Sequence, residues 1–179
     1  VIRWVSSDLG YAIGPSFVNP RAGQILGADI TIDYGFLTNI ASETDLFESF
    51  TSPSHHKNFK NCTLGAGLSI QQTAARAMLE TLGTTGEELT LLGKQFMTFL
   101  ILHEMGHTMG LNHNMKSSQM LSPAELSNKE ITQQLGVTGS VMDYPVANVA
   151  ADRSKQGDYY TTKTGPYDWW AIEYGYRPF

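Results

Sequence analysis

One short stretch, residues 103–113, constrains this chain more than any other. It reads HEMGHTMGLNH and fits the pattern H-E-x-x-H-x-x-G-x-x-H. His103 and His107 stand four residues apart, so on a helix both imidazoles lie on one face, one turn apart. Two imidazoles placed in this way can hold one zinc ion. The five specified residues are expected to match by chance about once in 100,000 chains of this length.

The other positions of the motif predict how the site is completed. Glu104 lies roughly 100° further round the helix than His103, which keeps it off the metal but within reach of a metal-bound water. Gly110 suits a backbone with positive φ that ends the helix, and the chain then turns back so that His113 approaches as the third ligand. Three protein ligands leave a fourth position open, which is typical of a catalytic zinc site. We therefore predict one catalytic Zn²⁺, which three histidines favour over other divalent ions.

Composition limits the classes of protein that fit. The chain has 179 residues, of which 41% are hydrophobic and 16% charged, which suits one globular domain with a sizeable core. Its net charge is −5 and it has no basic run, so we expect no nucleic-acid partner. No apolar stretch is long enough for a membrane span. The first five residues look like a strand rather than a signal peptide, so we expect a piece of a longer protein.

Hydrophobic periodicity and capping residues predict both strands and helices. The expected strands are residues 1–5 and a hairpin whose second strand covers residues 25–34. The expected helices are a short one at 45–50, then 69–82, a long one at 86–109 capped by Thr84 and Glu87, short ones from Pro123 and at 128–135, and a last one from Pro166 to Gly175. Glycines at 65 and 67 suggest a turn, and residues 146–165 read as a loop. The fold class is therefore α+β.

Three further groups of residues admit a second interpretation. Asp29 and Asp33 lie opposite Ile30 and Ile32 on a strand; they would suit Ca²⁺, but a solvated strand face is the more ordinary arrangement. The adjacent His55 and His56 are a poor chelating pair in a loop. Cys62 is the only cysteine, so we interpret it as a small buried hydrophobic residue, and an internal disulfide is excluded.

The long histidine motif, followed by Ser-Val-Met-Asp-Tyr at 140–144, resembles the metzincin metalloendopeptidases, which have a Met-turn beneath the zinc. Asp168 to Ile172, followed by Tyr174 and Gly175, is similar to their last helix. More closely, the chain resembles the catalytic core of a bacterial family of large zinc-dependent metalloproteases. The stretches that carry this resemblance are 2–5, 14–16, the turn through Pro20 and Gly23, 110–114, 140–145 and 157–175.

The resemblance implies a single catalytic domain over residues 1–179, with an upper part of about 1–110 and a lower part of about 111–179. The implied fold is a mixed twisted sheet with a long active-site helix, a Met-turn and a C-terminal helix. Metzincin domains usually begin with a strand and a helix before the part that starts here, so we expect a fragment that lacks them. Export from the cell and further domains of the parent protein are also implied.

The same resemblance assigns residues around the metal. Met142 is expected as a hydrophobic floor and not as a ligand. Tyr144 is expected near the zinc, where it supports the oxyanion of the reaction; the alternative is an aromatic residue that only packs beside Pro145. Residues 145–148 would form the wall of the pocket beyond the cleaved bond. An extended substrate would pair with an edge strand, for which residues 25–34 are our candidate.

The predicted reaction is hydrolysis of peptide bonds by a water molecule that zinc and Glu104 activate. Two other readings stay open at this stage. One is a zinc hydrolase that acts on a substrate other than a peptide, because the peptide substrate follows mostly from resemblance. The other is a zinc-binding module without turnover, although such modules often lose the general base and Glu104 is present.

Overall fold

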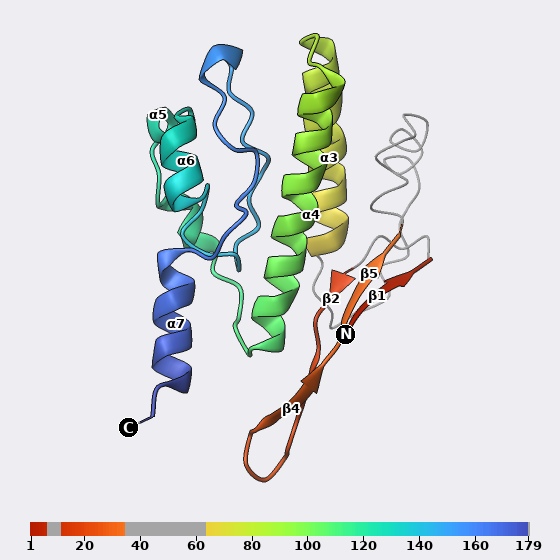
Figure 1. Ribbon diagram of the computed structural model, residues 1–179, viewed down its shortest axis with the longest axis vertical. Helices are drawn as coiled ribbons and strands as arrows, with labels where there is room; N and C mark the ends of the chain where they lie inside the picture. Colours follow the sequence, from red (N-terminus) through yellow and green to blue (C-terminus); the bar gives the residue numbers. More distant parts are fainter. Residues whose placement is uncertain (7–11, 35–63, 179) are drawn as a thin grey trace.

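The computed structural model describes residues 1–6, 12–34 and 64–178 (Figure 1). The strands are β1 (Ile2–Val5), β2 (Ala12–Ile13), β3 (Ser16–Val18), β4 (Ile25–Ala28) and β5 (Ile30–Asp33). The helices are α3 (Leu64–Thr81), α4 (Gly86–Thr108), α5 (Pro123–Leu126), α6 (Lys129–Leu135) and α7 (Pro166–Tyr176), with short 3-10 helices η1 (Met115–Gln119) and η2 (Arg153–Lys155). Strands come first and helices follow, which gives the α+β class that the sequence predicted.

The strands form a mixed sheet in the order β1-β5-β2 and a separate antiparallel ribbon of β3 and β4. Strand β1 runs parallel to β5, whereas β2 runs antiparallel to it. The prediction of one strand over residues 25–34 is therefore wrong. The chain changes partners at Asp29, whose carboxylate accepts a hydrogen bond from Arg3 at 3.0 Å. Alternating hydrophobicity continues across this break, so the pattern alone does not reveal it.

The position of β5 also corrects two expectations about its residues. Strand β5 lies between β1 and β2, so it is not an edge strand, and among the described strands of this sheet β2 is an edge. Asp33 is fully buried rather than solvated, while Asp29 forms an ion pair with Arg3. Neither aspartate belongs to a cluster of three or more metal-binding side chains within the described ranges.

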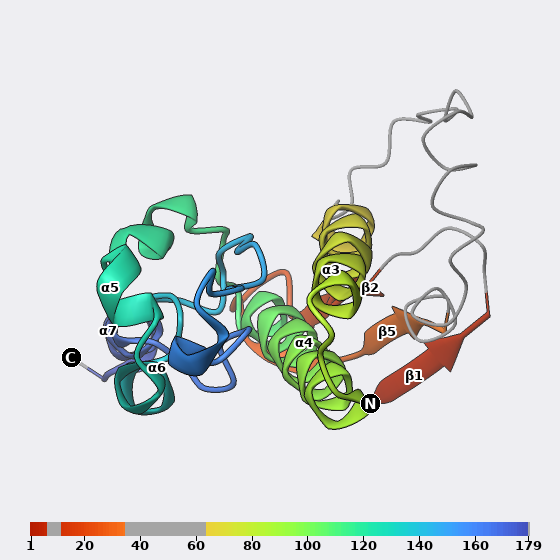
Figure 2. The ribbon, with the colours of Figure 1, turned by 90° about the horizontal axis from the view of Figure 1, so that it is seen from above.

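Helix α4 is the centre of the molecule, and its range confirms the predicted long helix. The N-cap is Thr85, whose hydroxyl accepts the N–H of Glu88 at 3.4 Å, one residue later than the predicted cap at Thr84. The helix packs beside α3 and against β5 and β2 (Figure 1). From above, α4 separates the sheet and α3 from the later helices α5, α6 and α7 (Figure 2).

Helix α3 begins at Leu64, five residues before the predicted start. Gly65 and Gly67, which suggested a turn, lie inside it. A glycine costs a helix about 1 kcal/mol relative to alanine, which weakens the helix without stopping it. The chain leaves α3 through Gly83, whose φ of 72° is a conformation that side chains other than glycine rarely adopt.

The hydrophobic core contains side chains from the strands, from α3 and α4, and from the segment that follows the metal motif. Buried side chains of the strands, α3 and α4 pack with two tyrosines from the segment that was expected to be an ordinary loop. Tyr160 packs edge-on against Phe96 with ring centroids 5.6 Å apart and stacks on Phe99 at 6.0 Å. The buried hydrophobic set is Ala12, Ile30, Ile32, Ala75, Leu79, Leu92, Phe96, Phe99, Leu100, Tyr159 and Tyr160.

Polar contacts fix the same segment to α4. The side chain of Gln95 donates to Asp158 at 2.8 Å and accepts the backbone N–H of Tyr159 at 2.7 Å. The ion pair between Arg153 and Glu88 is partly exposed, so it contributes about 0–1 kcal/mol. Each buried aromatic side chain contributes about 1.5–3 kcal/mol, so burial of the tyrosines is the larger effect.

The two short helices α5 and α6 begin close to where the sequence predicted them. Ser122 and Glu125 form a full capping box at α5, and Asn128 caps α6. Helix α7 starts at Pro166 as predicted and ends at Tyr176, one residue beyond the expected stop. Within the described part of the chain, no helix is both long and apolar enough to cross a membrane. The expected helix at 45–50, the pair His55–His56 and Cys62 fall outside the described residues.

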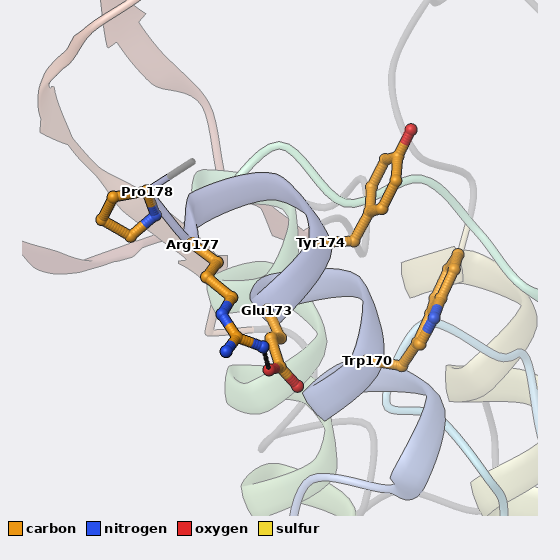
Figure 3. A pocket seen from close by; sticks show the side chains of 5 residues that line it. All are labelled: Trp170, Glu173, Tyr174, Arg177 and Pro178. Carbon is orange, nitrogen blue, oxygen red and sulfur yellow. Dashed lines mark hydrogen bonds and ion pairs between the residues drawn. The ribbon is translucent and has the colours of Figure 1, made fainter.

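Aromatic side chains of α7 are exposed rather than packed in the core. Trp169 is 70% exposed and Tyr174 is 74% exposed, and the ring of Tyr174 stacks on Trp170 with centroids 5.5 Å apart. Figure 3 shows the shallow pocket at this end of the helix, where Glu173 and Arg177 form an ion pair. Its lining consists of Trp170, Glu173, Tyr174, Arg177 and Pro178 and contains none of the motif residues.

Gly14 brings the turn after β2 into direct contact with α4. A Cβ atom at this position would lie 2.2 Å from the carbonyl oxygen of Glu104 and 2.9 Å from its carbonyl carbon. Backbone atoms cannot move aside as a flexible side chain does, so only glycine allows this approach. The carbonyl oxygen belongs to the metal motif itself, which makes β2 the strand that adjoins the site.

We expect Gly14→Ala to lower the free energy of unfolding by about 1–3 kcal/mol, because the added methyl group overpacks the contact with Glu104. Gly27→Ala is the matched control, since nothing lies within 4 Å of a Cβ built at Gly27. The control should change stability by less than about 0.5 kcal/mol. Urea unfolding of both variants measures the difference, and equal midpoints would contradict the close approach.

Candidate metal centre

The last turns of α4 carry the first two histidines of the motif. His103 is fully buried and His107 partly buried, and their ring centroids lie 4.8 Å apart. The Nδ1 of His103 lies 2.6 Å from the carbonyl oxygen of Val141, and that of His107 lies 3.0 Å from the carbonyl oxygen of Leu111. A carbonyl only accepts, so each Nδ1 donates and each Nε2 carries the lone pair that can bind a metal.

Gly110 ends the helix in the way that the motif predicted. Its φ is 83°, its N–H donates to the carbonyl of His107 at 2.9 Å, and the next N–H, of Leu111, donates to the carbonyl of Gly106 at 3.0 Å. These two bonds form a Schellman motif, which reverses the chain at a helix end. The reversal brings the carbonyl of Leu111 onto His107 and returns the chain toward the other two histidines.

His113 completes the cluster from outside the helix. One nitrogen from each of the three histidines lies within 4.8 Å of the others. The Nε2 atoms of His107 and His113 are 3.0 Å apart. Two nitrogens on one tetrahedral zinc are about 3.3 Å apart, given a Zn–N length of about 2.0–2.1 Å. The three imidazoles are therefore brought together at a spacing that suits one zinc ion.

The charge state of the cluster also suits a metal. Burial lowers the pKa of His103 to about 3, against the hydrogen bond to Val141, which raises it. Burial likewise lowers the pKa values of His107 and His113. The imidazoles are therefore neutral at pH 7 and keep the lone pairs that metal ligation requires.

The carboxylate of Glu104 is buried. It is 0% exposed, and neither carboxylate oxygen has a hydrogen bond of ordinary geometry among the described residues. Burial raises the pKa of Glu104 to about 7, against the backbone N–H of Gly14, which lowers it. A buried carboxylate without a well-formed hydrogen bond is costly in a site that only stabilises the fold. Its position beside His103 fits a site that receives water or substrate.

Met142 lies directly beneath the motif helix. It is fully buried, and a Cβ atom at Gly106 would lie 2.2 Å from its sulfur. The next residue back, Val141, supplies the carbonyl that orients His103. The turn at 140–144 therefore supports the helix by packing and one histidine by a hydrogen bond, as a Met-turn is expected to do.

Helix α7 fastens this turn through Asp168. The buried carboxylate of Asp168 accepts hydrogen bonds from the hydroxyl of Ser140 at 2.5 Å and from the N–H of Val141 at 2.9 Å. It also accepts the N–H of Gly165 at 2.8 Å, at the start of its own helix. The C-terminal helix and the Met-turn thus share one buried anion.

Tyr144 lies beside the cluster. Its hydroxyl is 3.1 Å from the Nε2 of His113, and the two ring centroids are 4.6 Å apart. Its ring centroid is also 5.7 Å from that of His103. Tyr144 is thus close enough to act on a molecule held at the cluster.

Three supporting residues of the site were not predicted from the sequence. They are Gly14, which adjoins Glu104, Asp168, which holds the Met-turn, and Asp143, which is described below. The position of Asp168 as the third residue of a predicted helix was a signal, because acidic residues there cap their own helix. Gly14 belongs to the stretch 14–16 that carries the family resemblance, but that resemblance assigned it no role at the site.

A sequence model of the family described as Met-zincin matches residues 85–179, which is more than half of the chain. The chain belongs to the Met-zincin family. The match covers α4, the histidine motif, the Met-turn and α7, so the resemblance inferred from the motifs is confirmed. Searches of curated proteins and of solved structures found no match. Family and histidine cluster together suggest a domain of the zinc metallopeptidase type.

We expect zinc at 100 times its dissociation constant to raise the melting temperature of this Met-zincin domain by about 5–10 °C, because ligand that binds only the folded state adds about 2.7 kcal/mol. His113→Ala should abolish most of this rise, and its exposed side chain makes the change mild for the fold. The control is the double variant at His55 and His56, changed to alanine, which should respond as the unmodified chain does. An equal rise in His113→Ala would contradict the assigned cluster.

Proposed function

We propose that the chain is the catalytic domain of a zinc-dependent endopeptidase. The observation that carries this proposal is the buried carboxylate of Glu104 next to three neutral histidines that converge from two segments. His103, His107 and His113 would hold the zinc ion. Bound there, zinc would supply Lewis acidity, which polarises a carbonyl and lowers the pKa of water.

The side chains of the protein would perform the proton transfers. Glu104 would accept a proton from the attacking water as the water oxygen bonds to the peptide carbon. It would then deliver that proton to the amine nitrogen as the C–N bond breaks, so the carboxylate is restored. The hydroxyl of Tyr144 would donate a hydrogen bond to the oxygen that becomes negatively charged on the peptide carbon.

We revise the candidate for the substrate strand. Residues 30–33 of the candidate 25–34 cannot pair with a substrate, because β1 and β2 occupy both sides of β5. Residues 25–28 form β4, which among the described strands pairs only with β3 in the separate ribbon. Strand β2 lies at an edge among the described strands, and Gly14 directly follows its last residue and touches the backbone of Glu104. An extended peptide paired along β2 would therefore run next to the proposed general base.

The segment after the Met-turn supports a second expectation about substrate. Pro145 is buried, whereas Val146 is 67% exposed. Asn148 is anchored through its side chain to the carbonyls of Leu126 and Asp158. We propose that this anchored segment forms the wall of the pocket beyond the cleaved bond. Export of the parent protein stays a prediction from the family resemblance.

We expect Glu104→Gln to reduce cleavage of casein by at least about 100-fold at equal zinc content, because the variant keeps the shape of the side chain and loses the base. Glu87→Gln, an exposed change on the first turn of the same helix, is the control and should keep full activity. Retention of activity in Glu104→Gln would exclude the proposed base. A wild-type chain that binds zinc and cuts no peptide would favour a non-peptide hydrolase or a binding module.

The role of Tyr144 has its own test. Tyr144→Phe keeps the ring that packs on His113 and removes only the hydroxyl, so we expect kcat to fall by about 100-fold while the zinc affinity stays within about twofold. Steady-state kinetics on a fluorogenic peptide measures kcat. An unchanged kcat would show that Tyr144 only packs beside Pro145.

A further inference from the structure

We propose that Asp143 is a positioning residue that fixes His113 and Tyr144 relative to each other. This inference rests on the proposed function, because both partners belong to the same site. Asp143 stands between Met142 and Tyr144 in the Met-turn, and its role is not implied by the histidine motif. The contacts of its two carboxylate oxygens carry the argument.

Asp143 is buried, with 2% of its surface exposed, and both oxygens are used. One oxygen accepts the hydroxyl of Ser117 at 2.8 Å, and the other accepts the backbone N–H of Tyr144 at 2.7 Å. Within the described ranges, Asp143 forms no ion pair. A buried carboxylate that meets only neutral donors is a weak source of stability. The burial of Asp143 is therefore better explained by a role in positioning the residues that it bonds.

One oxygen of Asp143 holds the chain that carries the third histidine. Ser117 lies in η1, four residues after His113, and its hydroxyl shares its one proton between Asp143 at 2.8 Å and the carbonyl oxygen of Asn114 at 2.9 Å. The N–H of Asn114, directly after His113, donates to the carbonyl of Met142 at 2.8 Å. The segment after His113 is therefore held to the Met-turn by two hydrogen bonds. One joins backbone groups, and the other joins the side chains of Ser117 and Asp143.

The other oxygen of Asp143 holds the backbone of Tyr144. That residue presents its ring to His113, and its hydroxyl lies 3.1 Å from the imidazole. Asp143 thus links the backbone of Tyr144 to the segment that carries His113, which it holds through the hydroxyl of Ser117. A shift of this carboxylate would change the distance between the third ligand and the tyrosine.

The third ligand needs such an anchor more than the first two do. His103 and His107 are carried by a long helix, and carbonyl groups of the chain orient both rings. His113 is exposed and lies outside any helix, so its place depends on the segment that carries it. Direct hydrogen-bond partners of a metal ligand typically change metal affinity by about 10–100-fold when they are altered. Asp143 acts on His113 through Ser117 and Tyr144, so we expect an effect at the lower end of that range.

The test compares Asp143→Asn with the matched control Asp158→Asn. Asp158 is also buried, and its carboxylate accepts the side-chain N–H of Gln95, eight residues before His103 on α4. Both variants neutralise one buried carboxylate. The readouts are the Zn²⁺ dissociation constant, from competition with a chelator, and the visible absorption bands of the Co²⁺-loaded protein, which report ligand geometry.

We expect Asp143→Asn to weaken Zn²⁺ binding by about tenfold or more and to alter the Co²⁺ bands, whereas Asp158→Asn stays within about twofold with unchanged bands. Asp143→Asn that matches the control in both readouts would overturn the proposal. If Asp143→Asn does not fold, Ser117→Ala decides the question, because it removes one donor and leaves the carboxylate. Zinc binding by Ser117→Ala should weaken in the same direction, and unchanged affinity and bands would overturn the proposal.

The same measurements separate this inference from the proposed function. A wild-type chain that binds Zn²⁺ and Co²⁺ but cuts no peptide would refute the endopeptidase proposal. The Zn²⁺ affinities and the Co²⁺ bands of the variants would still test the role of Asp143. A wild-type chain that takes up neither metal would overturn both.

Discussion

Helix α4 meets the Met-turn through a hydrogen bond and a close packing contact, and the metal centre depends on that junction. The hydrogen bond joins His103 to the carbonyl of Val141 at 2.6 Å, and the contact places Met142 against Gly106. Packing of this kind tolerates little change in volume, so it fixes the distance between the helix and the turn. The buried anion Asp168 holds the turn from the other side, and thereby makes α7 part of the site although it supplies no ligand.

The features that the sequence predicted correctly are those determined by residues close together in the chain. The spacing of His103 and His107 follows from the period of a helix, and Gly110 has the backbone conformation that the motif requires. The long helix and the short helices that start near Pro123 and Asn128 were also predicted correctly, because a capping residue acts within three residues of itself. Small errors at helix ends, such as Thr84 for Thr85, are of the size that fraying and alternative caps produce.

The parts that the sequence did not predict depend on contacts between distant residues. The break at Asp29 is set by which strands lie on either side, and alternation is the same before and after it. Tyr159 and Tyr160 stand in a polar stretch without helical or strand periodicity, yet they fill the core against α4. Nothing in the sequence around Asp143 indicates its contact with Ser117, which lies 26 positions earlier in the chain.

The three histidines lie within one stretch of 11 residues, from His103 to His113. A metal ion bound there closes only a short loop of chain, and the entropy that a cross-link removes from the unfolded state grows with the loop that it closes. The ion therefore does not act as a staple between the two sides of α4. Those sides are joined instead by the buried tyrosines, so we expect a metal-depleted chain to retain the framework on which the site is rebuilt when metal returns.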